Sequence, residues 1–142
     1  MPTTRSAEAH WEGPLMNGSG RVELTSSGVG GFDVTWASRA EDPDGRTSPE
    51  ELIAAAHSSC FSMALSHGLA QAGTPPTAID VKAEVDFQAG TGITGIRLAV
   101  RGSVPGLDEA GFEKAANDAK ENCPVSQALK AVPITLTEAA LF

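Results

Sequence analysis

The first third of the chain alternates short apolar and polar stretches with turn residues. Strands are predicted at Glu8–Glu12, Arg21–Thr25 and Phe32–Trp36, separated by the turn-rich pieces MNGSG and SSGVGG. Strands this close together in sequence favour an antiparallel meander. Residues 40–46, AEDPDGR, concentrate Asp, Pro and Gly and predict a loop that leads into a helix.

A long uncharged helix is predicted next. Ser48 suits the N-cap, Pro49 the first helical position and Glu51 the third, which together form a capping box. From Leu52 onward, LIAAAHSSCFSMALSHGLAQAG contains no charged residue, so small or apolar side chains occupy every face. We therefore expect this helix to be central and covered on all sides, and to end at Gly73, which Thr-Pro-Pro follows.

The second half begins with a hairpin and continues with helices. Ile79–Gln88 alternates apolar and charged residues, and Ile93–Val104 does the same after the turn AGTG, as a return strand would. Leu107–Asn122 has the spacing of an amphipathic helix, which Pro124 ends or kinks. A short helical turn, VSQALKA, and a last strand at Ile134–Thr137 complete the pattern. The predicted fold class is α+β.

Size and composition narrow the class of protein. The chain has 142 residues, 41% hydrophobic and 20% charged, as expected for one folded domain over residues 1–142. The formal net charge of -8 argues against binding to nucleic acid or to anionic membranes. Neither a secretory core nor a run of apolar residues long enough to span a bilayer is present. We therefore expect a cytoplasmic protein.

The two cysteines, Cys60 and Cys123, are too few for a disulfide scaffold. Cys60 lies about three turns into the uncharged helix, beyond the reach of the helix dipole, so by itself its thiol is expected to be inert. Cys123 precedes Pro124 and is the predicted N-cap of the short helix, where free N–H groups lower the pKa of a thiol. Local physics alone therefore favours Cys123 as the nucleophile.

A reactive Cys60 would need a cation from elsewhere in the chain. An arginine is the better candidate than a histidine, because it stays charged and can pair with a carboxylate that orients it. Glu50 and Glu51 are candidates for that carboxylate, although both also suit a helix N-terminus. The ordinary alternative to a catalytic role is a structural one, with the thiols and the His57 imidazole in the core and the arginines solvated at the surface. The spacing of the histidines and cysteines is only a weak indication of a metal site. The candidate cations are His57, His67, Arg39 and Arg46.

Two long motifs, SPEELIAAAHSSCFSMALSHGLAQAG and ENCPVSQALKA, closely resemble the cysteine motifs of the OsmC/Ohr family of osmotically inducible and organic-hydroperoxide-resistance proteins. The resemblance extends over nearly the whole chain through the segments AHWEG, VPGLDEAGF and ITLTE. His57 and the stretch Cys-Pro-Val-Ser-Gln resemble the OsmC branch of the family more than the Ohr branch. The resemblance implies a thiol peroxidase in which Cys60 attacks the peroxide and becomes a sulfenic acid. Cys123 then resolves that acid as a disulfide, which reverses the local assignment.

The same resemblance implies the rest of the site. An arginine, Arg39 or alternatively Arg46, would hold the Cys60 thiolate, and Glu50 would orient that arginine. The implied fold is an intertwined homodimer, with antiparallel sheets wrapped around two central helices. Organic hydroperoxides are the implied substrates, reduced better than hydrogen peroxide. A dithiol is the implied reductant, with lipoylated proteins as a class of partner, and no metal or organic cofactor is implied.

Two other functions remain open at this point. A non-catalytic redox sensor or ligand-binding dimer would keep the fold and form the Cys60–Cys123 disulfide only as a switch. A structural dimer with inert thiols would lose no free thiol on exposure to peroxide. Turnover with excess reductant separates the enzyme from the sensor.

Overall fold

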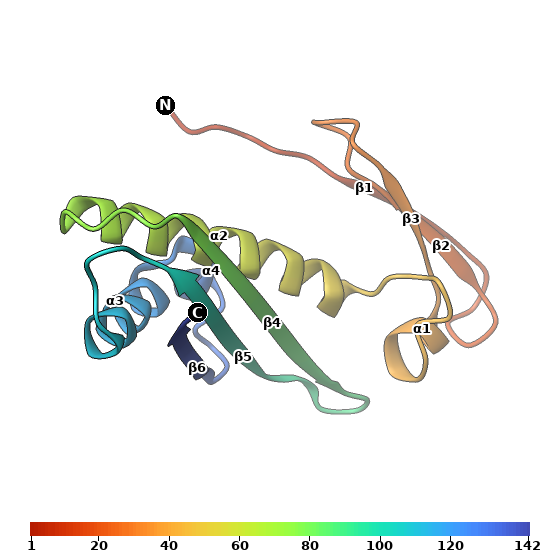
Figure 1. Cartoon of the computed structure of the whole chain (residues 1–142). Coiled ribbons are helices and arrows are strands. Elements are labelled where there is room, and N and C mark those ends of the chain that lie inside the picture. Colours follow the sequence, from red (N-terminus) through yellow and green to blue (C-terminus); the bar gives the residue numbers. More distant parts are fainter. The chain divides into compact units, whose positions relative to one another are not determined.

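The computed structural model describes residues 1–142, which divide into two compact units, Met1–Leu52 and Ile53–Phe142 (Figure 1). The assignment of residues 1–142 to one domain stays a prediction.

The first unit contains the predicted antiparallel meander. The strands are β1 (Glu8–Glu12), β2 (Ser19–Glu23) and β3 (Gly31–Val34), in that order in the sheet. A short helix, α1 (Trp36–Ala40), follows where the sequence predicted the end of a strand and a loop. Its cause is a local capping box that the strand pattern concealed: Thr35 accepts from the Ser38 N–H, and the Ser38 hydroxyl accepts from the Thr35 N–H.

Helix α2 (Pro49–Gln71) begins and ends where the sequence predicted. The Ser48 hydroxyl accepts a hydrogen bond from the Glu51 N–H at 3.1 Å. The Glu51 carboxylate does not complete the capping box, because it accepts from the Thr47 hydroxyl at 2.6 Å. At the other end Gly73 has a φ of +89°, and the N–H groups of residues 73 and 74 bond the carbonyls of residues 70 and 69. This is the glycine-dependent Schellman ending.

The second unit is built on a three-stranded sheet. The predicted hairpin is confirmed, because β4 (Ala78–Gln88) and β5 (Gly92–Ser103) pair antiparallel. Helices α3 (Glu109–Asn122) and α4 (Pro124–Ala128) then return the chain, and β6 (Ile134–Leu141) pairs with β5 in parallel. The periodicity identified β6 as a strand but underestimated its length and did not reveal its partner. The α+β class is confirmed.

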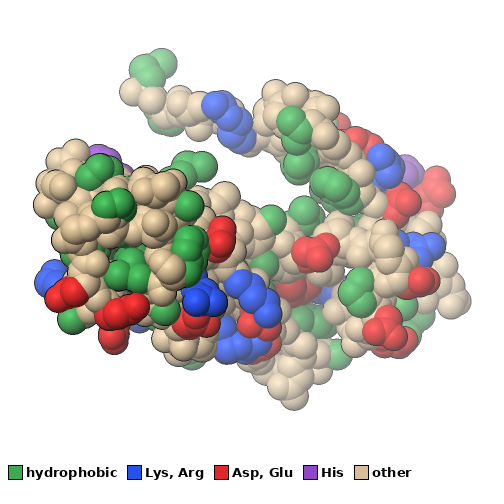
Figure 2. Space-filling view, viewed as in Figure 1, with side chains coloured by type: hydrophobic (Ala, Val, Ile, Leu, Met, Phe, Trp, Pro, Cys, Tyr) green, Lys and Arg blue, Asp and Glu red, His purple; other side chains and the backbone are tan.

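One face of this sheet carries the core, and the other carries charge. Leu98 and Val100 of β5 are buried against Phe61 and Leu65 of α2 and Phe112 of α3. On the opposite face, lysines and arginines alternate with acidic side chains in ion pairs (Figure 2). Such exposed pairs contribute little stability each. Burial of the apolar face therefore holds the second unit together.

Within the second unit, the expectation that α2 is covered on all sides is not met. One stripe at helical spacing, His57, Phe61, Leu65 and Leu69, is buried. On the opposite side Ala55, Ala56 and Ser59 are exposed, and Met63 is 69% exposed. The uncharged helix thus presents one face that the second unit leaves open. None of the helices has the length and apolar character that crossing a membrane requires.

Candidate active site

The second unit brings the two cysteines together. Cys60 lies in the middle of α2, and Cys123 is the residue between α3 and α4, at the N-cap of α4 as predicted. Both thiols are free, and their side chains are within hydrogen-bonding distance. Cys123 is completely buried, whereas Cys60 is partly exposed. A peroxide therefore has access to Cys60 and not to Cys123.

The free N–H groups of α4 act on a different sulfur from the one that the sequence suggested. The Val125 N–H bonds the Cys60 sulfur, while the Cys123 side chain makes no capping bond to its own helix. Burial nevertheless raises the pKa of the Cys60 thiol above its ordinary value, and the bond from Val125 only partly opposes this. Contact with the Cys123 thiol raises the pKa of Cys60 further. No cation of the second unit contributes to this balance.

His57 and Ser126 form a second link between the same elements. His57 lies one turn before Cys60 on α2, and its Nε2 is 2.7 Å from the Ser126 hydroxyl on α4. Both residues are buried, with His57 at 0% exposed. Its Nδ1 has no hydrogen-bond partner. Burial lowers the pKa of His57, so this imidazole is neutral in the folded protein at neutral pH.

A pH-dependent loss of stability follows from the buried His57. Its pKa is lowered from 6.5, so the unfolded chain binds more protons than the folded one once the pH falls below about 6.5. Folding stability should be complete above that pH and decline as the pH falls towards the lowered value. Urea midpoints at pH 7.5 and 5.5 should differ more in the wild type than in His57→Gln. Equal declines in the two proteins would contradict this.

The first unit positions Arg39 against Glu50. Arg39 is near the end of α1. Its Nε donates to Glu50 Oε1 at 2.9 Å and to Oε2 at 3.2 Å, and its Nη2 lies 2.8 Å from Oε1 in an ion pair. Glu50, in the first turn of α2, is 6% exposed, and the Arg39 side chain is 32% exposed. Contacts from two guanidinium nitrogens to one carboxylate fix the plane of the guanidinium. The structure therefore provides an oriented and partly accessible cation.

Short-range bonds hold α1 and the start of α2 in place around this pair. The Ser38 hydroxyl, beside Arg39 in sequence, lies 2.8 Å from the Thr47 carbonyl oxygen. The Thr47 N–H in turn donates to the Asp33 carbonyl of β3 at 3.0 Å. The position of Arg39 is thus determined by the sheet of the first unit and by the capping of its own helix.

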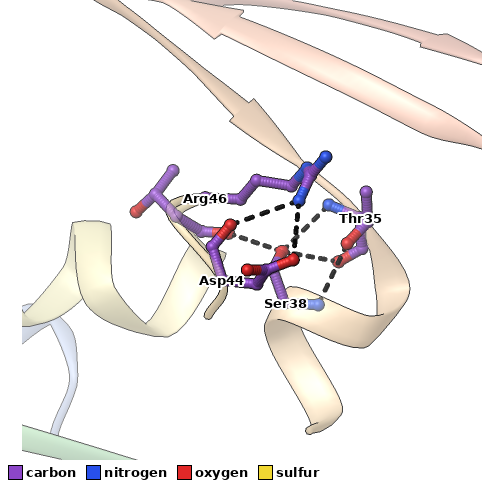
Figure 3. Close-up of polar contacts among 5 residues, drawn as sticks. Thr35, Ser38, Asp44 and Arg46 are labelled. Atoms are coloured by element: carbon purple, nitrogen blue, oxygen red, sulfur yellow. Dashed lines mark hydrogen bonds and ion pairs between the residues drawn. The ribbon is translucent and has the colours of Figure 1, made fainter. Parts of the chain in front are cut away.

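Arg46, the alternative arginine, is used differently. Its Nη1 donates to the carbonyl and carboxylate of Asp44 at 3.2 and 3.4 Å, within the same loop (Figure 3). Asp44 is highly exposed, and the Arg46 side chain is 43% exposed. Of the two arginines, Arg39 is the one bound to Glu50.

A cavity of about 590 Å³ lies along α2 and α3 in the second unit. Its lining includes Ala64, one turn after Cys60, and Pro124, next to Cys123, but neither cysteine itself. Its size is within the range of small-molecule sites. Small and apolar side chains line most of it, with a few polar side chains among them, including His67, Lys114, Asp118 and Asn122. No three His, Cys, Asp or Glu side chains come together as metal ligands would.

Comparison with known proteins decides the family. A sequence model described as "OsmC-like protein" matches residues 42–137, well over half of the chain. The chain belongs to the OsmC family. This OsmC-family chain is 44% identical over 134 residues to a protein named Peroxiredoxin OsmC from Escherichia coli, covering 92% of this chain and 93% of that one. It is also 33% identical to an organic hydroperoxide resistance protein from Xanthomonas axonopodis, covering 64% and 66%.

Solved OsmC-family structures share the fold. A crystal structure from Legionella pneumophila, described as an organic hydroperoxide resistance protein OsmC, aligns with a TM-score of 0.73 at 27% identity. The alignment covers 98% of this chain and 96% of that one. The OhrB protein of Bacillus subtilis aligns with a TM-score of 0.67 at 25% identity, covering 94% and 97%.

Two features of this OsmC-family site were missing from the sequence interpretation. These are the Val125 N–H on the Cys60 sulfur and the His57–Ser126 bond. A partial signal was present, because Pro124 marks a helix start whose free N–H groups need an acceptor. The sequence did not reveal that this acceptor is Cys60.

Proposed function

We propose that this chain is a thiol peroxidase that reduces organic hydroperoxides, with Cys60 as the attacking thiol and Cys123 as the resolving thiol. The observation that carries the proposal is the cysteine pair itself, in which a partly exposed thiol contacts a fully buried one. Its relatives named Peroxiredoxin OsmC and organic hydroperoxide resistance protein support the same chemistry. A largely apolar cavity, whose lining includes Ala64 and Pro124 near the two cysteines in sequence, favours an organic substituent over hydrogen peroxide.

The first step oxidises Cys60. Its thiolate attacks the terminal peroxide oxygen, an S–O bond forms, and the O–O bond breaks. The leaving alkoxide takes a proton and departs as the alcohol, so that the peroxide is reduced by two electrons. Cys60 is left as a sulfenic acid, which the nearby thiol captures.

The second step closes the disulfide and prepares the next turnover. The Cys123 sulfur attacks the sulfenic sulfur of Cys60, an S–S bond forms, and hydroxide leaves with the Cys123 proton as water. A dithiol then reduces the disulfide by thiol exchange. A dihydrolipoyl group on a partner protein is a dithiol of this class. The proposal places the reaction in the cytoplasm, where thiol pools keep such cysteines reduced.

Arg39, oriented by Glu50, is the proposed source of the missing positive charge. Burial raises the pKa of Cys60, so the thiolate needs a cation at neutral pH. Arg39 is the candidate because a buried carboxylate already fixes its guanidinium, whereas Arg46 is bound within its own loop. The same guanidinium would stabilise the alkoxide as it forms.

A homodimer is part of this proposal. The exposed face of α2 around Ala56 and Met63 is uncharged, unlike the outer face of the sheet, and supports burial against a second copy. Glu50 and Arg39 would complete the site in that assembly.

Turnover distinguishes the enzyme from a redox sensor. With limiting cumene hydroperoxide and no reductant, the reduced protein should lose two thiols per peroxide consumed. With excess dihydrolipoamide it should consume many equivalents of peroxide, measured by the loss of peroxide over time. Consumption that stops after about one equivalent despite fresh dithiol would support the sensor instead.

A further inference from the structure

We propose that His57 and Ser126 are positioning residues for the resolving step: their hydrogen bond holds the first turn of α4, and with it Cys123, against Cys60. This inference rests on the proposed function, because it concerns how the sulfenic acid of that reaction is captured. It assigns a role to a buried pair that the chemistry of the two thiols does not itself use.

The bond joins the two elements that carry the cysteines. His57 is three residues before Cys60 on α2, and Ser126 is three residues after Cys123 in α4. The Nε2–Oγ distance of 2.7 Å is that of a good hydrogen bond, and both residues are buried. The link therefore fixes α4 to α2 one turn away from the sulfur atoms.

A histidine is a costly choice at this place if packing is its only purpose. Its Nδ1 is buried without a hydrogen-bond partner, so one of the two ring nitrogens has lost its contact with water and gained nothing in return. An apolar side chain of similar size would fill the same volume without that cost. The cost is offset only if the bond from Nε2 to Ser126 is needed.

Helix α4 needs such a link because its other side-chain hydrogen bond, from Gln127, goes to α3 and not to α2. It has only five residues, and the side chain of its N-cap, Cys123, makes no capping bond. Its backbone packs mainly on α3, so its register with α2 depends on side chains. Apart from contacts that involve Cys60 itself, the His57–Ser126 bond is the one hydrogen bond between α2 and α4.

The resolving step requires accurate placement. In it the Cys123–Cys60 S–S bond forms, the S–O bond of the sulfenic acid breaks, and the hydroxide leaves with the Cys123 proton as water. The new bond is only about 2.05 Å long and has a narrow dihedral preference. Losing one hydrogen bond that holds Cys123 in place should slow this step about tenfold, while oxidation of Cys60 stays unchanged.

Matched variants at residue 57 isolate the bond. The amide of His57→Gln extends to the position of Nε2 and keeps a partner for Ser126, whereas His57→Asn extends only to the position of Nδ1. Ser126→Ala removes the other partner, and Ser62→Ala, whose hydroxyl bonds only its own helix, is the control. Each protein receives one equivalent of cumene hydroperoxide with dimedone present, and mass spectrometry gives the ratio of trapped Cys60 sulfenic acid to disulfide.

The expected result is a ratio about tenfold higher in His57→Asn and Ser126→Ala than in the wild type, Ser62→Ala and His57→Gln. The redox potential of the disulfide in glutathione buffers should move by about 30 mV towards oxidising values in the same two variants, since tenfold corresponds to about 30 mV. If folded His57→Asn protein had the same ratio of trapped sulfenic acid to disulfide and the same redox potential as the wild type, the positioning role would be overturned. If the wild type forms neither the dimedone adduct nor the Cys60–Cys123 disulfide and the peroxide remains, the proposed function fails, and this inference fails with it.

Discussion

Cys60→Ser should reduce peroxidase activity to the background of the uncatalysed reaction, a loss of at least about a thousandfold. Cys60 is the thiol that a substrate can reach, since Cys123 is completely buried. A serine hydroxyl in the same place is too weak a nucleophile to attack the peroxide bond without a neighbouring base. The measurement is the initial rate of cumene hydroperoxide loss with excess dihydrolipoamide.

Cys123→Ser is the matched control for that experiment. It should reduce about one equivalent of peroxide at the wild-type rate and then stop or slow, because the sulfenic acid at Cys60 has no resolving thiol. If Cys60→Ser kept full turnover, or if Cys123→Ser were the only inactive variant, Cys123 would be the nucleophile. That is the assignment the N-cap position alone suggested.

Arg39→Ala should slow the oxidation of Cys60 by about two orders of magnitude, which corresponds to about 3 kcal/mol of lost stabilisation. Burial raises the pKa of the Cys60 thiol, so without the cation little thiolate remains at neutral pH. Below the raised pKa Cys60 is mostly the protonated thiol, and above it Cys60 is mostly the thiolate. The oxidation rate of the variant should therefore increase as the pH increases. The measurement is the second-order rate of thiol oxidation between pH 6 and 10.

Arg46→Ala serves as the control for charge alone. Arg46 donates to Asp44 within an exposed loop, so its removal should change the rate by less than about twofold. Glu50→Gln should give an intermediate loss, because the amide weakens the bonds that orient Arg39. A large effect at residue 46 with none at residue 39 would transfer the role to Arg46.

The parts of the fold that were predicted correctly from the sequence are those determined by residues close together in the chain. Ser48 and Pro49 determine the start of α2, and Gly73, with its positive φ, determines its end. The alternation in Ala78–Gln88 and Gly92–Ser103 determined the hairpin and its buried face. In each case the residues that decide the structure lie within a few positions of one another.

The parts that sequence did not predict depend on distant partners. The parallel pairing of β6 with β5 is set by the path of α3 and α4, and strand periodicity carries no information about it. Helix α1 was hidden because Thr35 and Ser38 cap it inside a stretch that resembles a strand. The Val125 N–H reaches Cys60 only because α4 folds back onto α2, which no local motif specifies.

The most direct test of the account is to identify which sulfur receives the oxygen. Reduced Cys123→Ser protein would be treated with one equivalent of cumene hydroperoxide and dimedone, and its peptides would be analysed by mass spectrometry beside those of the wild type. The account predicts a dimedone adduct on the Cys60 peptide of the variant and a Cys60–Cys123 disulfide in the wild type. An unmodified Cys60 in the variant, with peroxide remaining in solution, would contradict it.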